Sequence, residues 1–204
     1  MRILIGTPVH ESKDYSMDRW LESVSKLEYP FDLLMVDNSP NFEYLKKIHE
    51  YCKKYGIINY KLVHTDVGSN SILDERLAQS RELIRQEVLD QGYDAWFSLE
   101  CDVIAPTDTL TKLVDLIDDY WMVSHAYPGR DNPLDTNVEF GITLIKRQAL
   151  EKYGFVNQYG YIDPLRPDCW YGNEVWFIRR IDRDDEGKHI HVYGNIKPIY
   201  HLNQ

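Results

Sequence analysis

Two carboxylates, Glu100 and Asp102, directly follow an apolar run at residues 95–99. The bulky residues of this run are continuous, which is typical of a short strand buried on both faces. Residues two apart in a strand project to the same side, so both acids could face one point in space. Carboxylate oxygens are hard ligands that suit Mg2+ or Mn2+, and a cation held there could in turn hold phosphates. An isolated E-x-D sequence is more often a solvated turn, so the other elements of the chain decide between these interpretations.

Composition restricts the class of protein. A chain of 204 residues with 43% hydrophobic content can bury one substantial core, so we expect a single domain. The net charge of -10 argues against general electrostatic binding of nucleic acid or anionic lipid. The three cysteines are widely spaced and include no C-x-x-C pair, which fits a reducing compartment rather than a disulfide framework or a structural zinc site. The apolar N-terminal run is too short for a signal peptide or a membrane span, so we expect a cytoplasmic protein without a transmembrane segment.

Apolar strands alternate with amphipathic helices in the first half of the chain, which is typical of βαβ units and a parallel sheet. In such sheets, ligands bind at the carboxyl ends of the strands. The patterns predict strands at 2–7, 31–36, 59–64, 95–99, 121–126 and 139–146, helices at about 15–26, 45–55, 71–90, 107–117, 147–153 and 172–181, and one more strand in the tail 189–204.

The order of these elements and acids resembles the GT-A class of nucleotide-sugar glycosyltransferases, especially its large inverting group with small single-domain members. Glu100 and Asp102 match the position of the D-x-D motif that binds a metal on the donor diphosphate, with Glu100 in place of the first Asp. Residues 80–85 (SRELIR) resemble the A-R-N-x-x-R helix of that class, which would place Arg81 near the donor. Pro8 lies in a segment similar to the end of the first strand, where the nucleotide base and ribose lie, and Asp37 falls where such enzymes place an acid near the base.

The second half of the chain carries further similarities. Residues 140–155 resemble the segment that borders the acceptor site. Glu174 falls where the class has an acid pair opening a helix, and His201 occupies the place of the late histidine that completes the metal site in many members. By this resemblance, Glu174 is the candidate catalytic base.

The resemblance implies an α/β fold: a single-domain, Rossmann-like GT-A α/β/α sandwich with a central, mostly parallel sheet. About 1–105 would form the nucleotide-sugar donor half, and about 106–204 the acceptor half and C-terminal tail. Asp102, Glu100 and His201 would hold Mn2+ or Mg2+ for transfer of a hexose from a UDP- or GDP-sugar with inversion, while Glu174 would deprotonate the acceptor hydroxyl. The acceptor itself is not identified by the sequence; we expect a carbohydrate, lipid-linked or protein hydroxyl, with the aromatic loop 154–171 as the acceptor wall.

Other interpretations remain open from the sequence. A nucleotidyltransferase or a non-catalytic nucleotide-sugar-binding protein could share the fold, although residues 7–11 (TPVHE) lack the Gly-rich, Lys- or Arg-bearing loop that a nucleotidyltransferase usually has. Arg81 and Arg85 could simply pair with acids along a helix face. Glu174 could be a first-turn acid favoured by the helix dipole, and Asp37 a turn former. His201 could belong to a histidine zinc site with His189 and His191.

Overall fold

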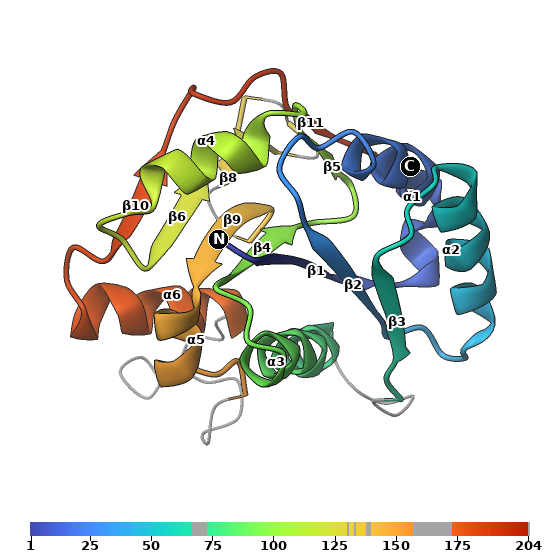
Figure 1. Cartoon of the computed structure of the whole chain (residues 1–204), viewed down its shortest axis with the longest axis horizontal. Helices are drawn as coiled ribbons and strands as arrows, with labels where there is room; N and C mark the ends of the chain where they lie inside the picture. The colour runs from blue at the N-terminus through green and yellow to red at the C-terminus, as the bar shows by residue number, and fades with distance from the viewer. Residues whose placement is uncertain (67–72, 130, 133, 138–139, 157–172, 204) are drawn as a thin grey trace.

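A seven-stranded sheet forms the centre of the computed structural model, which describes residues 1–66, 73–129, 131–132, 134–137, 140–156 and 173–203 (Figure 1). Its strand order is β10-β6-β9-β4-β1-β2-β3. Strand β9 runs antiparallel to both of its neighbours, and all the other pairs are parallel, which confirms the prediction of a mostly parallel sheet. The strands span Ile3–Val9 (β1), Asp32–Asp37 (β2), Tyr60–His64 (β3), Ala95–Leu99 (β4), Met122–His125 (β6), Ile142–Lys146 (β9) and His189–Val192 (β10).

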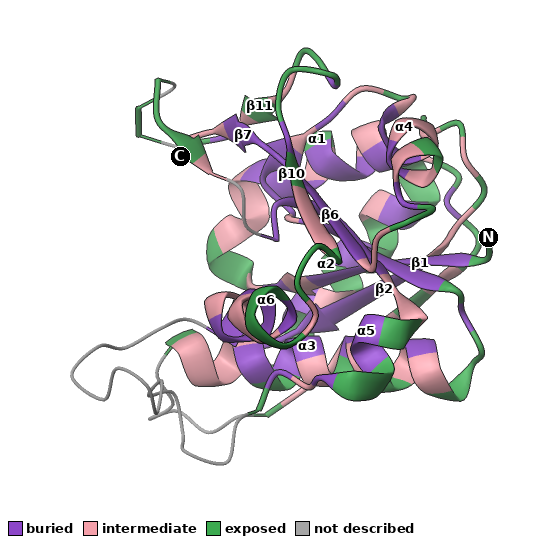
Figure 2. Ribbon diagram, turned by 90° about the vertical axis from the view of Figure 1, so that its left-hand side faces the viewer, coloured by how far each residue is buried: buried purple, intermediate pink, exposed green. Residues whose placement is uncertain are grey.

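Helices cover both faces of this sheet (Figure 1). Helices α1, α2 and α4 pack on one face, and helices α3, α5 and α6 pack on the other. Figure 2 shows buried segments on the helix surfaces that are turned toward the strands. The helices span Asp14–Val24 (α1), Glu43–Lys54 (α2), Leu73–Asp90 (α3), Thr109–Leu116 (α4), Arg147–Lys152 (α5) and Asn173–Asp184 (α6).

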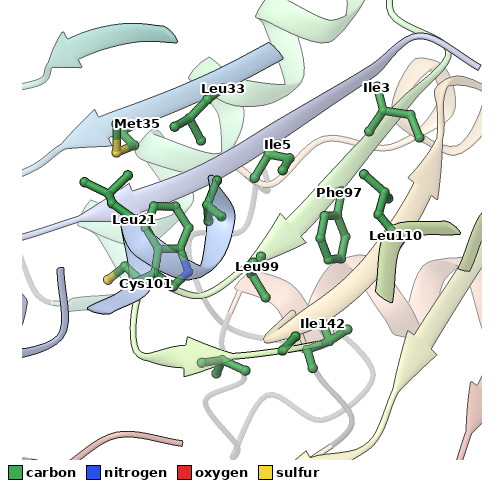
Figure 3. Close-up of a cluster of buried hydrophobic side chains, with 14 of the residues drawn as sticks. Ile3, Ile5, Leu21, Leu33, Met35, Phe97, Leu99, Cys101, Leu110 and Ile142 are labelled. Atoms are coloured by element: carbon green, nitrogen blue, oxygen red, sulfur yellow. The ribbon is translucent and has the colours of Figure 1, made fainter. Parts of the chain in front are cut away.

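The two cores follow from the alternation of side chains along each strand. In β1, Ile3 and Ile5 point to the core beneath α1, α2 and α4, whereas Leu4 points to the core beneath α3, α5 and α6. Strand β4 repeats the pattern, with Phe97 in the first core (Figure 3) and Trp96 in the second. Strands that are buried on both faces must be apolar at consecutive positions, which is why their sequences read as continuous apolar runs.

Gly6 allows helix α3 to lie close to the centre of the sheet. A Cβ atom at this position would lie 2.3 Å from Cγ2 of Ile84 and 2.8 Å from Nε1 of Trp96. The carbonyl oxygen of Gly6 accepts a hydrogen bond of 2.9 Å from the same Trp96 nitrogen. The absent side chain therefore sets the distance between β1 and the helix that carries Arg81.

Short elements lie beyond the carboxyl ends of the main strands. A 3-10 helix, Glu11–Lys13, follows β1, between the predicted strand at 2–7 and the predicted helix at about 15–26. Strand β5 (Val103–Ile104) pairs with β11 (Tyr200–His201), and β7 (Tyr127–Pro128) pairs with β8 (Thr136–Asn137), both antiparallel. The loop predicted at 154–171 as an acceptor wall lies almost entirely outside the described residues.

Candidate metal and anion-binding site

The acids after β4 converge through a tight turn. Strand β4 ends at Leu99, and the backbone N–H of Val103 donates a 2.9 Å hydrogen bond to the carbonyl oxygen of Glu100. Cys101, between the two acids, is directed into the hydrophobic cluster in Figure 3. Glu100 and Asp102 therefore face the same region because of turn geometry, and not because of the strand alternation that the sequence suggested.

The pairing of β11 with β5 brings a distant histidine to these acids. His201 is the register partner of Val103, the residue after Asp102. The backbone N–H of Leu202 also donates a 2.8 Å hydrogen bond to the carbonyl oxygen of Asp102. As a result, ligand atoms of Glu100, Asp102 and His201 all lie within 4.8 Å of one another. The structure thus brings together the three residues that the sequence predicted as metal ligands.

The tautomer of the neutral His201 ring suits it to bind a cation. Its Nδ1 lies 3.0 Å from the carbonyl oxygen of Pro128, which can only accept a hydrogen bond, so Nδ1 carries the proton in the neutral ring. The lone pair is then on Nε2, a buried atom without a hydrogen-bond donor among the described residues. This Nε2 lies 3.6 Å from Oδ2 of Asp102, and adjacent ligands of an octahedral Mg2+ are about 3 Å apart. A small adjustment would allow both atoms to bind one divalent cation.

Asp102 already has other polar neighbours. Its side chain is 2% exposed, and its Oδ2 contacts Nζ of Lys13. The hydroxyl of Tyr15 donates a 3.2 Å hydrogen bond to the same oxygen. The buried carboxylate is therefore stabilised by a positive charge from the protein.

Glu100 lies in a less favourable environment for a charge. Burial, and after it the nearby carboxylates of Asp102 and Glu174, raise the pKa of its carboxyl to about 7, against the opposing effects of Arg81 and His201. The closest cationic nitrogen of Arg81, Nη2, is 4.0 Å from Oε1 of Glu100. A cation at this point would relieve the excess of negative charge.

Arg81 connects the acids at the end of β4 with the start of helix α6. Its side chain is only 3% exposed, its Nη1 donates a 2.6 Å hydrogen bond to Oδ1 of Asn173, and the same nitrogen contacts Oε2 of Glu174. By contrast, Arg85 donates to the carbonyl oxygen of Leu150 over 2.6 Å, and so joins α3 to α5. Of the two arginines in the predicted motif, Arg81 faces the candidate site, whereas Arg85 joins two helices.

A cavity of about 280 Å³ opens beside these residues at the carboxyl ends of β1 and β4. Its walls supply three cationic side chains and two carboxylates, together with apolar surface from β1 and α3, which is a composition that suits a phosphorylated ligand with an attached ring system. The lining residues that could contact such a ligand include Pro8, Lys13, Asn38, Arg76, Arg81, Glu100 and Asp102.

Asp37 does not line this cavity. It is fully buried, its Oδ1 accepts a 3.1 Å hydrogen bond from the backbone N–H of Ser39, and its Oδ2 lies 2.9 Å from Nδ1 of His64. The hydroxyl of Ser39 in turn accepts a 2.8 Å hydrogen bond from the backbone N–H of Glu11. Asp37 therefore fixes the loop that presents its neighbour Asn38 to the cavity.

The sequence did not single out Lys13, Tyr15 or Arg76 as site residues. Lys13 and Tyr15 follow β1 just as Glu100 and Asp102 follow β4, so polarity after a buried strand was a signal for them too. His189 and His191 lie on β10, and neither joins the cluster of Glu100, Asp102 and His201.

Comparison with known proteins identifies the fold. No family model and no curated protein matches the sequence. A mannosyltransferase from Pyrobaculum calidifontis, solved with GDP-Man and Mn2+, is 14% identical with a TM-score of 0.68; the match covers 94% of this chain and 55% of that structure. TarS of S. aureus in complex with UDP is 12% identical with a TM-score of 0.65, covering 95% of this chain and 60% of that one. The glycosyltransferase GlyE of Streptococcus pneumoniae TIGR4 is 12% identical with a TM-score of 0.54, and the match covers 94% of this chain and 46% of that structure.

These likenesses show that the chain has the GT-A glycosyltransferase fold, as the sequence predicted. The chain spans 55% of the mannosyltransferase and 60% of the TarS structure, so the likeness covers only part of each of those proteins. Within the described part of the chain, no helix has both the length and the apolar composition needed to cross a membrane.

Proposed function

We propose that this chain is a metal-dependent glycosyltransferase that transfers a hexose from a nucleotide-sugar to an acceptor hydroxyl. The observation that carries the proposal is the convergence of Glu100, Asp102 and His201 beside the cavity that Arg81 lines. On a GT-A fold, this combination supplies ligands for a cation and positive charge for phosphates at the carboxyl edge of the sheet. Several solved structures with the same fold carry glycosyltransferase names.

The donor would be a UDP- or GDP-sugar. Asp102, Glu100 and His201 would hold Mn2+ or Mg2+, and the bound cation would stabilise the negative charge that develops on the departing diphosphate. Arg81 is buried and held by Asn173, so its guanidinium is oriented before the ligand arrives and can offer two N–H groups to a phosphate. Pro8 and Asn38 would border the base and ribose, with Asp37 acting through the loop that it fixes.

Glu174 is the proposed catalytic base. Its contact with Arg81 fixes the carboxylate close to the candidate diphosphate site, and the reaction needs a carboxylate that accepts the proton of the acceptor hydroxyl. Attack from the face opposite the leaving group would invert the sugar configuration. The proposed acceptor is a carbohydrate, lipid-linked or protein hydroxyl, and a cytoplasmic location remains a prediction.

A panel of nucleotide-sugars tests this function. The full chain is incubated with each donor and with Mn2+ or Mg2+, and release of nucleoside diphosphate is measured together with donor binding. Asp102→Ala should abolish metal-dependent donor binding, and Glu174→Gln should retain binding but lose turnover. Asp118→Ala, which changes an exposed acid outside the cavity, is the matched control.

The outcomes separate the alternatives. Release of pyrophosphate from a nucleoside triphosphate and a sugar phosphate, without release of nucleoside diphosphate, would identify a nucleotidyltransferase. Metal-dependent binding of a nucleotide-sugar without release of nucleoside diphosphate would identify a non-catalytic binder. The proposal fails if no nucleotide-sugar binds, or if both site variants remain as active as Asp118→Ala.

A further inference from the structure

Lys13 makes a direct contact with the best-placed ligand of the candidate metal site. It ends the 3-10 helix that follows β1, and its Nζ contacts Oδ2 of Asp102. The side chain of Lys13 is 28% exposed, whereas that of Asp102 is 2% exposed, and both residues line the cavity. The ammonium group is thus the more solvent-accessible partner of this ion pair.

The same oxygen of Asp102 belongs to the candidate cation site. Nε2 of His201, which carries the free lone pair, lies 3.6 Å from this Oδ2. A divalent cation that bound both atoms would share Oδ2 with the Lys13 ammonium. Like charges repel strongly at such separations in a mostly buried site, where water screens them little. Lys13 and a divalent cation therefore compete for Asp102.

Lys13 has another partner available once a cation is bound. Its flexible four-carbon side chain lines the same cavity as Arg76 and Arg81, the cavity assigned above to the donor diphosphate. An ammonium displaced from Asp102 would find the phosphate oxygens within this cavity, and a charge-assisted hydrogen bond there would replace the one that it lost.

We propose that Lys13 is an exchangeable counter-ion: it neutralises Asp102 in the metal-free protein and transfers to the donor diphosphate when a divalent cation takes its place. The second half of this inference rests on the proposed function, whereas the first half concerns the cation alone. The exchange keeps the buried carboxylate paired at every stage. It also makes cation binding and diphosphate binding mutually favourable, because each removes the ammonium group from a competing position.

The variant Lys13→Met tests the exchange because it keeps an unbranched, flexible side chain and removes the ammonium group. Mn2+ binding is measured by electron paramagnetic resonance without nucleotide, and UDP and GDP binding is measured by calorimetry at saturating Mn2+. We expect roughly tenfold tighter Mn2+ binding and roughly tenfold weaker diphosphate binding than in the wild type. Lys13→Arg, which keeps the charge, should stay close to the wild type in Mn2+ affinity, and the exposed Lys26→Met should change neither quantity.

A purely structural ion pair gives the opposite result. If Lys13 only holds Asp102 in position, Lys13→Met will bind Mn2+ as weakly as the wild type or more weakly, and the inference is overturned. Unchanged diphosphate affinity in Lys13→Met would overturn the transfer to the donor. Lys13→Gln and circular dichroism of each variant exclude misfolding as the cause. If wild-type protein binds Mn2+ but neither UDP nor GDP, the proposed function is in question, while the Mn2+ measurements still decide the competition for Asp102.

Discussion

Nδ1 of His201 donates its proton to the carbonyl oxygen of Pro128 over 3.0 Å, which leaves Nε2 as the basic nitrogen 3.6 Å from Oδ2 of Asp102. The hydrogen bond fixes both the tautomer and the ring orientation before any cation arrives. A histidine on a strand of two residues is thereby held in the geometry of a metal ligand.

Replacing this ligand should weaken cation binding directly. We expect His201→Ala to lower Mn2+ affinity by roughly tenfold to a hundredfold, because Asp102 and Glu100 remain as ligands. Titration of Mn2+ followed by electron paramagnetic resonance measures the effect. His191→Ala, an exposed histidine on β10, is the control and should bind Mn2+ as the wild type does. Equal affinities of the two variants would remove His201 from the site.

The raised pKa of Glu100 predicts that cation affinity depends on pH. With a pKa of about 7, Glu100 in the metal-free protein holds a proton at pH 6 and has lost it at pH 8. A cation must displace this proton, so Mn2+ affinity should increase from pH 6 to pH 8, by up to about tenfold per pH unit below 7, with release of protons on binding. Mn2+ titrations in two buffers of different ionisation enthalpy measure both effects.

The raised pKa of Glu100 also affects the stability of the folded protein. Between its ordinary pKa of 4.5 and the folded value of about 7, Glu100 binds more protons in the folded protein than in the unfolded one. The metal-free protein should therefore lose stability as the pH rises through this window, and saturating Mn2+ should remove that loss. Glu100→Gln should show a flatter dependence on pH for both Mn2+ affinity and unfolding temperature. A variant with the full wild-type pH dependence would show that another group is responsible.

Glu174 should affect turnover and leave donor binding nearly unchanged. We expect Glu174→Gln to reduce kcat by roughly a hundredfold to ten-thousandfold, because the amide cannot accept the proton of the acceptor hydroxyl. Calorimetry with UDP and GDP should give affinities close to those of the wild type. Asp184→Asn, at the other end of α6, is a matched control for a change of charge on this helix. A large loss of nucleotide affinity in Glu174→Gln would instead assign Glu174 to the positioning of Arg81.

The sequence predicts those parts of the structure that depend on patterns along a single segment. Residues 95–99 form the predicted strand because burial on both faces requires consecutive apolar residues. Gly56, which directly follows the predicted helix at 45–55, has a φ of 65°, which favours glycine. The antiparallel direction of β9 was not predicted, because an apolar strand has the same pattern in either direction.

The candidate site was predicted only in part, because some of its residues come together through contacts between distant segments. The acids after β4 lie two residues apart in the sequence, whereas His201 reaches them through the pairing of two-residue strands, and only the family resemblance suggested its place. Lys13 was missed because a short 3-10 helix turns its side chain toward Asp102, and such helices have weak sequence signals. The lysine also lies just beyond residues 7–11, the segment in which the sequence indicated no basic residue after the first strand.

Asp37 offers a test between direct and indirect contact with a nucleotide. Its carboxylate is fully buried and bonded to Ser39 and His64, so Asp37→Asn should lower the free energy of unfolding by about 1–3 kcal/mol. Chemical denaturation measures this loss. Affinity for UDP and GDP should change little if the loop keeps its shape. Wild-type stability with a large loss of nucleotide affinity would show that Asp37 contacts the base itself.

Alanine variants of Gly6 and Gly56 distinguish the cost of a steric clash from the cost of backbone strain. Gly6→Ala places a Cβ 2.3 Å from Cγ2 of Ile84, so α3 must move away from β1, and we expect the free energy of unfolding to decrease by about 1–3 kcal/mol. Gly56→Ala meets no atom within 4 Å, but its φ of 65° is strained for alanine, at a cost of about 1 kcal/mol. Denaturation and diphosphate binding are measured for both variants. Because α3 carries Arg81, only Gly6→Ala should also weaken binding of UDP or GDP, and an equal affinity in the two variants would show that the position of α3 does not control the site.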